Sequence, residues 1–340
     1  MEIEMSFTAT ERLLPLPWIP PSGSPGPVHT LAWQGDSLVD WVGYLLFRLD
    51  GSHTQPPGYA YGYRFDAAIT SPSGEFVAIY ERFGTKALLL RNGELLRELN
   101  RSYYCAESYE YPVAFIRLPT GQELLAHCPA EYCRLEIDDA ATGQCLTGGK
   151  TRDPNDYFFS RLRSSPSGQY LVSGGWVWHP WDVVKLFDVA EALRDPSHLD
   201  GSGIKLSLEG ETGPACFGPN DSLILKDSFD NDTTPPVEQG HLRSFDIRTR
   251  SLRTDTLPAA PLGEMMAVGN DHVINFHTHP RLINLHTGVI EHEWSHLNTG
   301  TSTSSISDNS TRSILALDPQ NLRFAVVGET AIHVLELKQG

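Results

Sequence analysis

The same short pattern, Ser-Pro-Ser-Gly followed by an apolar run, occurs twice in this chain of 340 residues. Ser71-Pro72-Ser73-Gly74 precedes Phe76-Val77-Ala78-Ile79, and Ser165-Pro166-Ser167-Gly168 precedes Tyr170-Leu171-Val172. Pro and Gly in this order are typical of a tight turn, and the β-branched and aromatic residues that follow favour a strand. The sequence therefore contains a repeated unit of a turn followed by a strand.

Five looser copies extend this pattern over the chain: Gly35-Asp36, Thr120-Gly121, Asn220-Asp221, Asn270-Asp271 and Gln320-Asn321. One anchor per copy, at positions 36, 74, 121, 168, 221, 271 and 321, gives spacings of 38, 47, 47, 53, 50 and 50 residues. Short strands repeated at this period, with almost no helix, are typical of a β-propeller. We therefore predict an all-β fold in which residues 1–340 form one seven-bladed β-propeller of four-stranded antiparallel blades.

The two ends of the chain complement each other. The last unit stops after its third strand, at Leu335-Glu336-Leu337, and the stretch Ile3 to Phe7 is a spare strand at the N-terminus. Pairing between them completes the last blade and protects an edge that is otherwise open to aggregation. We expect truncation of the first ten residues to destabilise the whole fold.

One unit also carries a family resemblance. Ser165-Pro166-Ser167-Gly168, Ser173-Gly174-Gly175 and Val184-Lys185-Leu186-Phe187-Asp188 together resemble the repeat of WD40-type propellers, and Phe245-Asp246 repeats its ending. The Gly-His and Trp-Asp dipeptides of that family are missing, which implies a divergent member without the family's His-to-Asp hydrogen-bonded network. The resemblance covers essentially the whole chain and implies a fold that serves many functions, so function is argued from sites.

Composition restricts the class of partner. The chain has 26 basic and 42 acidic residues, a formal charge of -16, so its field repels nucleic acid and anionic lipid and attracts cationic partners. We find no signal peptide, and no apolar run approaches the ~18 residues of a membrane span. Five cysteines, an odd number, do not suggest a disulfide framework. We expect a cytoplasmic protein with reduced thiols that binds neither nucleic acid nor membrane.

We expect the face with the tight turns to carry short loops, apart from an insertion near Val189 to Asp200 with one helical turn. Long loops are expected to gather on the other face of the propeller, and their composition predicts a binding surface. Tyr and Trp dominate interface hot spots because they offer large, rigid contact area with a polar tip. Together with nearby acids, they predict contact with a basic protein partner. The candidates are Tyr103, Tyr104, Tyr109, Tyr111, Tyr157, Trp176, Trp178, Trp181, Asp182, Asp230 and Asp232. The alternative is that about half of these aromatic residues fold back over the blade ends, with Trp176 and Trp178 ending lengthened strands.

Metal binding is the weaker interpretation of a histidine cluster. Six of the thirteen histidines fall between His272 and His296, and His277 and His279 would project to the same side of an extended segment. The histidines span several strands, so polar hairpin residues are the favoured interpretation. The acidic loop Asp227 to Asp232 lacks the Gly and terminal Glu of a calcium loop, and no Cys-x-x-Cys knuckle is present. We predict no cofactor and no metal, with His277 and His279 as the weak candidates.

Motifs of common enzyme classes are absent: we find no Gly-x-Ser-x-Gly elbow, no phosphate-binding loop and no dinucleotide fingerprint. We predict a non-catalytic protein-binding propeller, either a scaffold or an immunity-type inhibitor of a basic toxin. The alternative is a hydrolase or lyase at the mouth of the central channel, near Asp182, Asp230, His277 and His279. A third hypothesis is carbohydrate binding through Trp176, Trp178 and Trp181.

Overall fold

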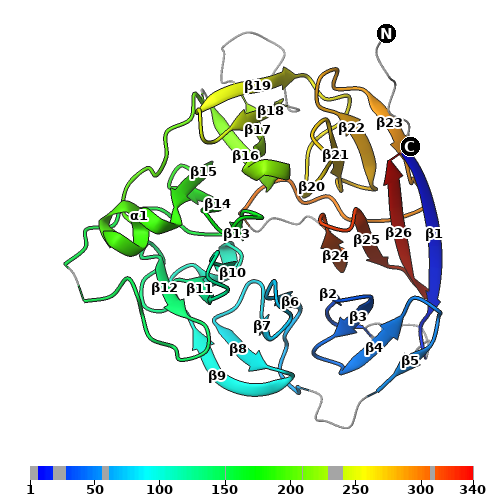
Figure 1. The fold of residues 1–340 in the computed structure, drawn as a ribbon, viewed down its shortest axis with the longest axis horizontal. Coiled ribbons are helices and arrows are strands. Elements are labelled where there is room, and N and C mark those ends of the chain that lie inside the picture. Colours follow the sequence, from blue (N-terminus) through cyan, green and yellow to red (C-terminus); the bar gives the residue numbers. More distant parts are fainter. Residues whose placement is uncertain are drawn as a thin grey trace.

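Seven antiparallel sheets form a ring around a central axis (Figure 1). The computed structural model describes residues 7–17, 28–55, 61–149, 151–208, 210–228, 240–306 and 311–339. Each sheet meanders outward from the axis, as in the order β6-β7-β8-β9. The predicted seven-bladed β-propeller is confirmed.

The strands follow chain order around the ring, except that β1 belongs to the last blade. Blade 1 contains β2 (Ala32–Gln34), β3 (Ser37–Asp40), β4 (Leu45–Arg48) and β5 (His53–Thr54). Blade 2 contains β6 (Ala67–Thr70), β7 (Phe76–Tyr80), β8 (Lys86–Arg91) and β9 (Glu94–Asn100). Blade 3 contains β10 (Val113–Arg117), β11 (Glu123–His127) and β12 (Glu136–Asp139). Blades 4 and 5 contain β13 (Arg163–Ser164), β14 (Tyr170–Val177) and β15 (Trp181–Asp188); β16 (Glu211–Phe217), β17 (Leu223–Ser228), β18 (His241–Asp246) and β19 (Ser251–Thr256). Blades 6 and 7 contain β20 (Met265–Val268), β21 (His272–Asn275), β22 (Arg281–Asn284) and β23 (Ile290–Glu293); β24 (Leu315–Asp318), β25 (Arg323–Val327), β26 (Ala331–Gln339) and β1 (Phe7–Pro15).

Blades 3 and 4 have irregular outer positions. In blade 3, Leu146 donates its N–H to the carbonyl of Ile137 at 2.8 Å, which continues the sheet without a full fourth strand. In blade 4, the chain instead forms α1 (Val189–Arg194) and the 3₁₀ turn η2 (Pro196–Leu199). Asp188 caps α1 by accepting the N–H of Glu191 at 3.0 Å. The predicted insertion between residues 189 and 200 is therefore confirmed. Two further 3₁₀ turns are η1 (Ala106–Ser108) and η3 (Pro219–Asp221).

The ring closes where β1 pairs with β26, as predicted. Pairing is antiparallel and runs from Phe7 opposite Gln339 to Pro15 opposite Ala331. The predicted strand bounds, residues 3 to 7, are wrong in extent, because the strand continues to Pro15 and positions 3 to 6 lie outside the described residues. Most of β1 is exposed, so it lacks the apolar run that marks the inner strands.

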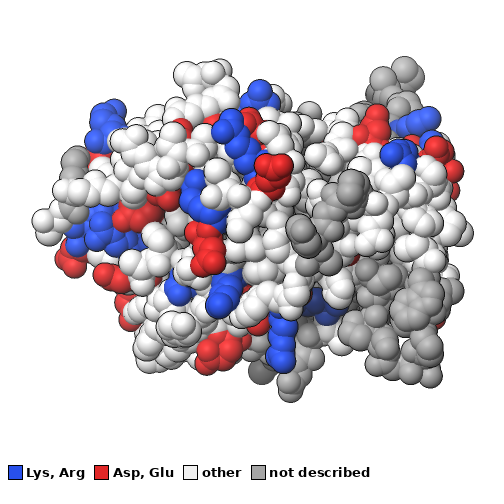
Figure 2. Space-filling model, turned by 90° about the horizontal axis from the view of Figure 1, so that it is seen from below, with Lys and Arg blue, Asp and Glu red and all other residues white. Residues whose placement is uncertain are grey.

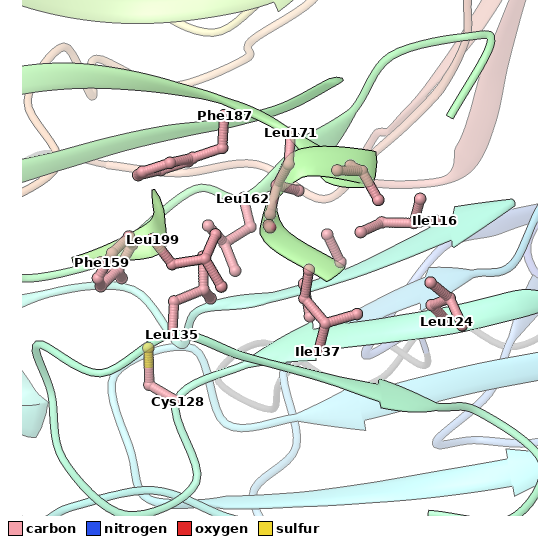
Figure 3. Packing of buried hydrophobic residues seen from close by; sticks show 14 of the residues in the cluster. Ile116, Leu124, Cys128, Leu135, Ile137, Phe159, Leu162, Leu171, Phe187 and Leu199 are labelled. Atoms are coloured by element: carbon pink, nitrogen blue, oxygen red, sulfur yellow. The ribbon is translucent and has the colours of Figure 1, made fainter. Parts of the chain in front are cut away.

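The hydrophobic core lies between blades. Among the clusters of buried side chains in the described residues, seven lie between blades, one for each pair of neighbours around the ring. Figure 3 shows the cluster between blades 3 and 4. It contains Ile116 and Leu124 of blade 3, Leu171 of blade 4, and Leu199 of η2. Because both faces of a blade are covered, a strand such as β7 is buried along its whole length.

The Ser-Pro-Ser-Gly turns join neighbouring blades. The hydroxyls of Ser71 and Ser73 each donate to Glu123 of the next blade at 2.7 Å. In the second copy, the N–H of Ser167 donates to Asp221 at 3.1 Å. These hydrogen bonds link blade 2 to blade 3 and blade 4 to blade 5.

The outer side of the ring seen in Figure 2 carries Lys and Arg side chains interspersed with Asp and Glu side chains. No helix in the described ranges is long and apolar enough to span a membrane.

Candidate functional site

One face of the propeller carries the long connections between blades. The connection from blade 6 to blade 7 crosses the centre of the ring (Figure 1) and reaches blades 3 and 4. There Ile306 forms a β-bridge with Tyr109, and the N–H of Ser305 donates to Asp182 at 3.1 Å. Through these two contacts, the crossing segment is bound to the chain at Tyr109 and at Asp182.

A stack of buried aromatic rings lies beneath this face. Phe158 stacks on Trp176 with ring centroids 4.0 Å apart and an angle of 5° between the planes. Tyr109 meets Phe158 edge-on at 5.2 Å. All three side chains are buried, so they form a hydrophobic base and not a contact surface.

A second layer of rings covers this base and faces solvent. Tyr132 stacks on Phe158 at 4.3 Å and lies 4.9 Å from Tyr104, while Trp178 packs edge-on against Trp176 at 5.2 Å. Trp178 is 44% exposed and Tyr104 49%. Tyr103, beside Tyr104 in the chain, is 84% exposed. We call Tyr103, Tyr104, Tyr132 and Trp178 the aromatic patch.

A buried arginine holds the loop that carries two of these tyrosines. The Arg101 guanidinium donates to the carbonyls of Ala106 at 2.7 Å, Tyr109 at 2.9 Å, Gly84 at 2.7 Å and Glu110 at 3.2 Å. It also lies over the Tyr109 ring, 4.3 Å from the centroid. One side chain thereby satisfies four loop carbonyls that would otherwise be costly to bury.

The hairpin that presents Trp178 joins β14 and β15, which have eight residues each and are longer than the strands of blade 3. The Tyr157 hydroxyl accepts the N–H of Gly175 at 2.8 Å and lies 2.9 Å from the carbonyl of Val183, linking both strands. A Cβ at Gly175 would lie 2.0 Å from the carbonyl oxygen of Phe158. Glycine is therefore required where this hairpin crosses the aromatic stack.

Glu107 and Glu131 are exposed acids on the segments that carry the patch, and the exposed Asp153 and Asp156 lie on the segment that leads to Phe158. Asp156 accepts a hydrogen bond from the Tyr132 hydroxyl at 2.7 Å. This arrangement places negative charge beside apolar rings, which suits a partner with Lys or Arg side chains.

The predicted partner-binding residues divide into two groups. Tyr103, Tyr104 and Trp178 are exposed, and Trp181 is half-buried. Five of the predicted contact residues are buried under the loops: Tyr109, Tyr111, Tyr157, Trp176 and Asp182. The rings cover the ends of blades, while Asp182 accepts a hydrogen bond from the N–H of Ser305. Asp230 and Asp232 lie outside the described residues.

Sequence reasoning missed Tyr132, Phe158 and Arg101. Tyr132 lies in the turn between β11 and β12 and is a single aromatic residue without a pattern around it. Phe158 lies before β13 in the aromatic run Tyr157-Phe158-Phe159, which was a signal that the prediction used only for Tyr157. Arg101 had no signal, since its partners are main-chain carbonyls.

His277 and His279 were expected on the same side of an extended segment, but the chain between them is not extended. The N–H of His279 donates to the carbonyl of His277 at 2.8 Å, and Thr278 has a positive φ of 63°, so the chain turns sharply. His279 lies 3.2 Å from Glu293. Burial, and then the charge of Arg281, lowers the pKa of His277. Within the described ranges neither belongs to a group of three metal-ligating side chains.

The central channel has a volume of about 830 Å³ and contains Glu110 and Glu264 among its lining residues. Glu110 pairs with Arg161 at 2.8 Å, and Glu264 pairs with Arg163 at 2.5 Å. Burial alone would raise the pKa of each carboxyl, but the surrounding arginines outweigh it and hold both pKa values low. A general acid at neutral pH needs the opposite shift, so this pair gives no support to a paired-carboxylate enzyme.

The five cysteines are free thiols in this structure. Burial raises the pKa of Cys216 to about 12 and that of Cys128 well above its ordinary value. Both are therefore protonated at neutral pH and act as small apolar groups.

Comparison with known proteins yields a fold. No family model and no curated protein matches the chain. Among solved structures, a chain of the "Crystal Structure of Mitotic Checkpoint Complex" is similar with a TM-score of 0.59 and 11% sequence identity. The match covers 99% of this chain and 94% of that chain. With the seven blades described above, this likeness supports a WD40-like propeller fold, and no more, since the identity is low.

Proposed function

We propose that this propeller is a non-catalytic module that binds a basic protein on the aromatic patch. The observation that carries the proposal is the two-layered aromatic cluster, in which Tyr104, Tyr132 and Trp178 rest on the buried rings of Phe158 and Trp176. Rings that are already held in place lose little freedom when a partner binds, so they favour affinity.

Charge favours the class of partner. The chain has a formal charge of -16, exposed Glu107 and Glu131 are close in sequence to patch residues, and Asp156 accepts a hydrogen bond from Tyr132. A negative field speeds encounter with a basic surface, and the aromatic residues then slow dissociation. Basic side chains also stack favourably on exposed tyrosine and tryptophan rings.

Two roles share this surface. As a scaffold, the propeller would hold the basic protein in a complex. As an immunity-type inhibitor, it would cover the active cleft of a basic toxin or nuclease. We place both in the cytoplasm, where five free thiols stay reduced. Carbohydrate binding gains no support, because Trp176 is buried and Trp181 half-buried, which leaves Trp178, at 44%, as the one exposed ring of the three.

The test is affinity capture from the native host with increasing salt, followed by measurement of the affinity for the purified partner. We compare the wild type with a Tyr104→Ala/Trp178→Ala variant. We expect one basic protein to be retained by the wild type, released at high salt, and bound at least about tenfold more weakly by the variant.

The matched control is Leu95→Ala, an exposed apolar residue on the outer strand β9 that is 55% exposed. It should bind the partner as the wild type does. The proposal fails if no protein is captured, if capture is insensitive to salt, or if the patch variant binds as tightly as the control.

A further inference from the structure

Three side chains with metal-ligating atoms converge on the outside of the ring, away from the aromatic patch. They are Glu11, His296 and His333. One ligand atom of each lies within 4.8 Å of the other two, which in the described part of the chain occurs for this group alone. None of them belongs to the site described above.

The ring closure brings these residues together from distant parts of the sequence. Glu11 is on β1 and His333 on β26, and the register places Glu11 opposite Leu335 and Leu13 opposite His333. Glu11 and His333 are thus diagonal neighbours on one face of the closing pair. Figure 1 shows β1 beside β26 at the outer edge of the ring.

The third residue comes from the neighbouring blade. His296 lies in the connection that follows β23 and is 52% exposed at its side chain. On either side of it, Trp294 and Leu297 are buried in the cluster between blades 6 and 7. The chain on both sides of His296 is therefore anchored, and its ring is directed toward Glu11.

The distances are close to those of a metal site. His333 Nδ1 lies 2.7 Å from Glu11 Oε1, and His296 Nε2 lies 3.1 Å from both oxygens of the same carboxylate. Ligands of a tetrahedral zinc ion with bonds of 2.0–2.1 Å are separated by about 3.3 Å. The two nitrogen–carboxylate separations thus need to widen by a few tenths of an ångström, and the ligand atoms of the two histidines already lie within 4.8 Å of each other.

The donor set and the exposure agree with this chemistry. Two imidazoles and one carboxylate form a ligand set that zinc prefers, with water completing the fourth position. The side chains of Glu11 and His333 are 31% and 23% exposed, so the ion and its water can enter. A Cβ at Gly328 would lie 2.9 Å from His333 Nε2, so this glycine leaves space for the imidazole.

We propose that Glu11, His296 and His333 bind a zinc ion that fastens the closing strand to the connection between blades 6 and 7. Because the three ligands come together only when the ring is closed, zinc binds the folded state and stabilises it. The alternative is that two histidines form ordinary hydrogen bonds to one surface carboxylate, without affinity for metal.

The test uses the full chain, treated with a chelator and then titrated with zinc chloride. We expect one zinc ion per chain by calorimetry and a rise in melting temperature that grows with zinc concentration. Cobalt chloride in place of zinc should give the intense visible absorption of a four-coordinate site. His296→Ala and His333→Ala should each lose at least about tenfold in zinc affinity, and the melting temperature should no longer respond to zinc.

His296→Ala alters an exposed side chain outside the strands, so it separates loss of metal from loss of fold. The matched control is His286→Ala, whose imidazole pairs with Asp271 at 2.9 Å and is 58% exposed at its side chain. This control should bind zinc as the wild type does. The proposal is overturned if zinc does not bind with a stoichiometry of one, or if His296→Ala and His333→Ala bind it as tightly as the control.

Discussion

Glu110 is a carboxylate on which the charges of three arginines converge. Its carboxylate accepts from Arg82 at 3.2 Å, Arg161 at 2.8 Å and Arg312 at 2.6 Å. These arginines come from the β7–β8 turn and from the connections that precede β13 and β24, so one carboxylate joins distant parts of the ring. Its loss would leave three cations close together in a poorly hydrated place.

We therefore predict that Glu110→Gln lowers the free energy of unfolding by about 3–5 kcal/mol. The pKa of Glu110 is depressed in the folded state, because the charges of the arginines outweigh the effect of burial. Its stabilisation is thus present above the unfolded pKa of about 4.3 and is lost as pH falls toward the folded value.

Urea denaturation at several pH values between about 7 and 3 measures this effect. The wild type should lose more stability on acidification than Glu110→Gln does. Glu107→Gln, an exposed acid in the same connection, is the control and should change little. Equal acid sensitivity of the wild type and Glu110→Gln would contradict the prediction.

Among the elements, β1 is the strand that closes the ring. It supplies the outer strand of blade 7 through nine paired residues, yet its side chains are mostly exposed. Leu14 is the exception at 1% exposed, and it packs in the cluster between blades 7 and 1 with Leu38 and Val334. The adjacent Leu13 is 59% exposed.

These neighbours give a matched pair of substitutions. Leu14→Ala should reduce the free energy of unfolding by about 2–5 kcal/mol, because it opens a cavity in a core that spans the ring closure. Leu13→Ala should change it by less than about 0.5 kcal/mol. Chemical denaturation of both variants checks the difference, and similar losses would show that the closure depends on strand pairing alone.

The blades were predictable because their signals are local. A turn such as Ser71 to Gly74 and the apolar strand after it lie within ten residues, and the pattern recurs at nearly constant spacing. The extent of β1 was not predictable, since a strand paired at an outer edge needs few apolar residues. The outer position of blade 4 was predicted only as an insertion with one helical turn.

The site was less predictable, because burial of a loop residue depends on what crosses it. Tyr109 is covered through its bridge to Ile306, and Asp182 is occupied by Ser305, both more than a hundred positions away in the chain. Composition correctly indicated an aromatic face. It did not show which rings face solvent.

Over the whole molecule, the excess of acidic residues sets two opposite responses to salt. The formal charge of -16 is held in one compact ring, so the acids repel one another more in the folded state than in the expanded chain. The same charge attracts the proposed basic partner. Salt screens both interactions, with a Debye length that falls from about 30 Å at 0.01 M to about 8 Å at 0.15 M.

We predict that raising potassium chloride from about 0.02 M to about 0.5 M increases the melting temperature while it slows association with the partner. Chloride is preferred to sulfate, because sulfate strengthens burial of apolar surface by another route. Paired ions such as Glu110 with its arginines are buried, so they are screened less than the surface acids and do not reverse the trend.

Scanning calorimetry measures the melting temperature, and stopped-flow mixing measures the association rate. A melting temperature that falls with potassium chloride would mean that exposed ion pairs outweigh the repulsion, and an association rate independent of salt would mean that the partner is not recognised by charge.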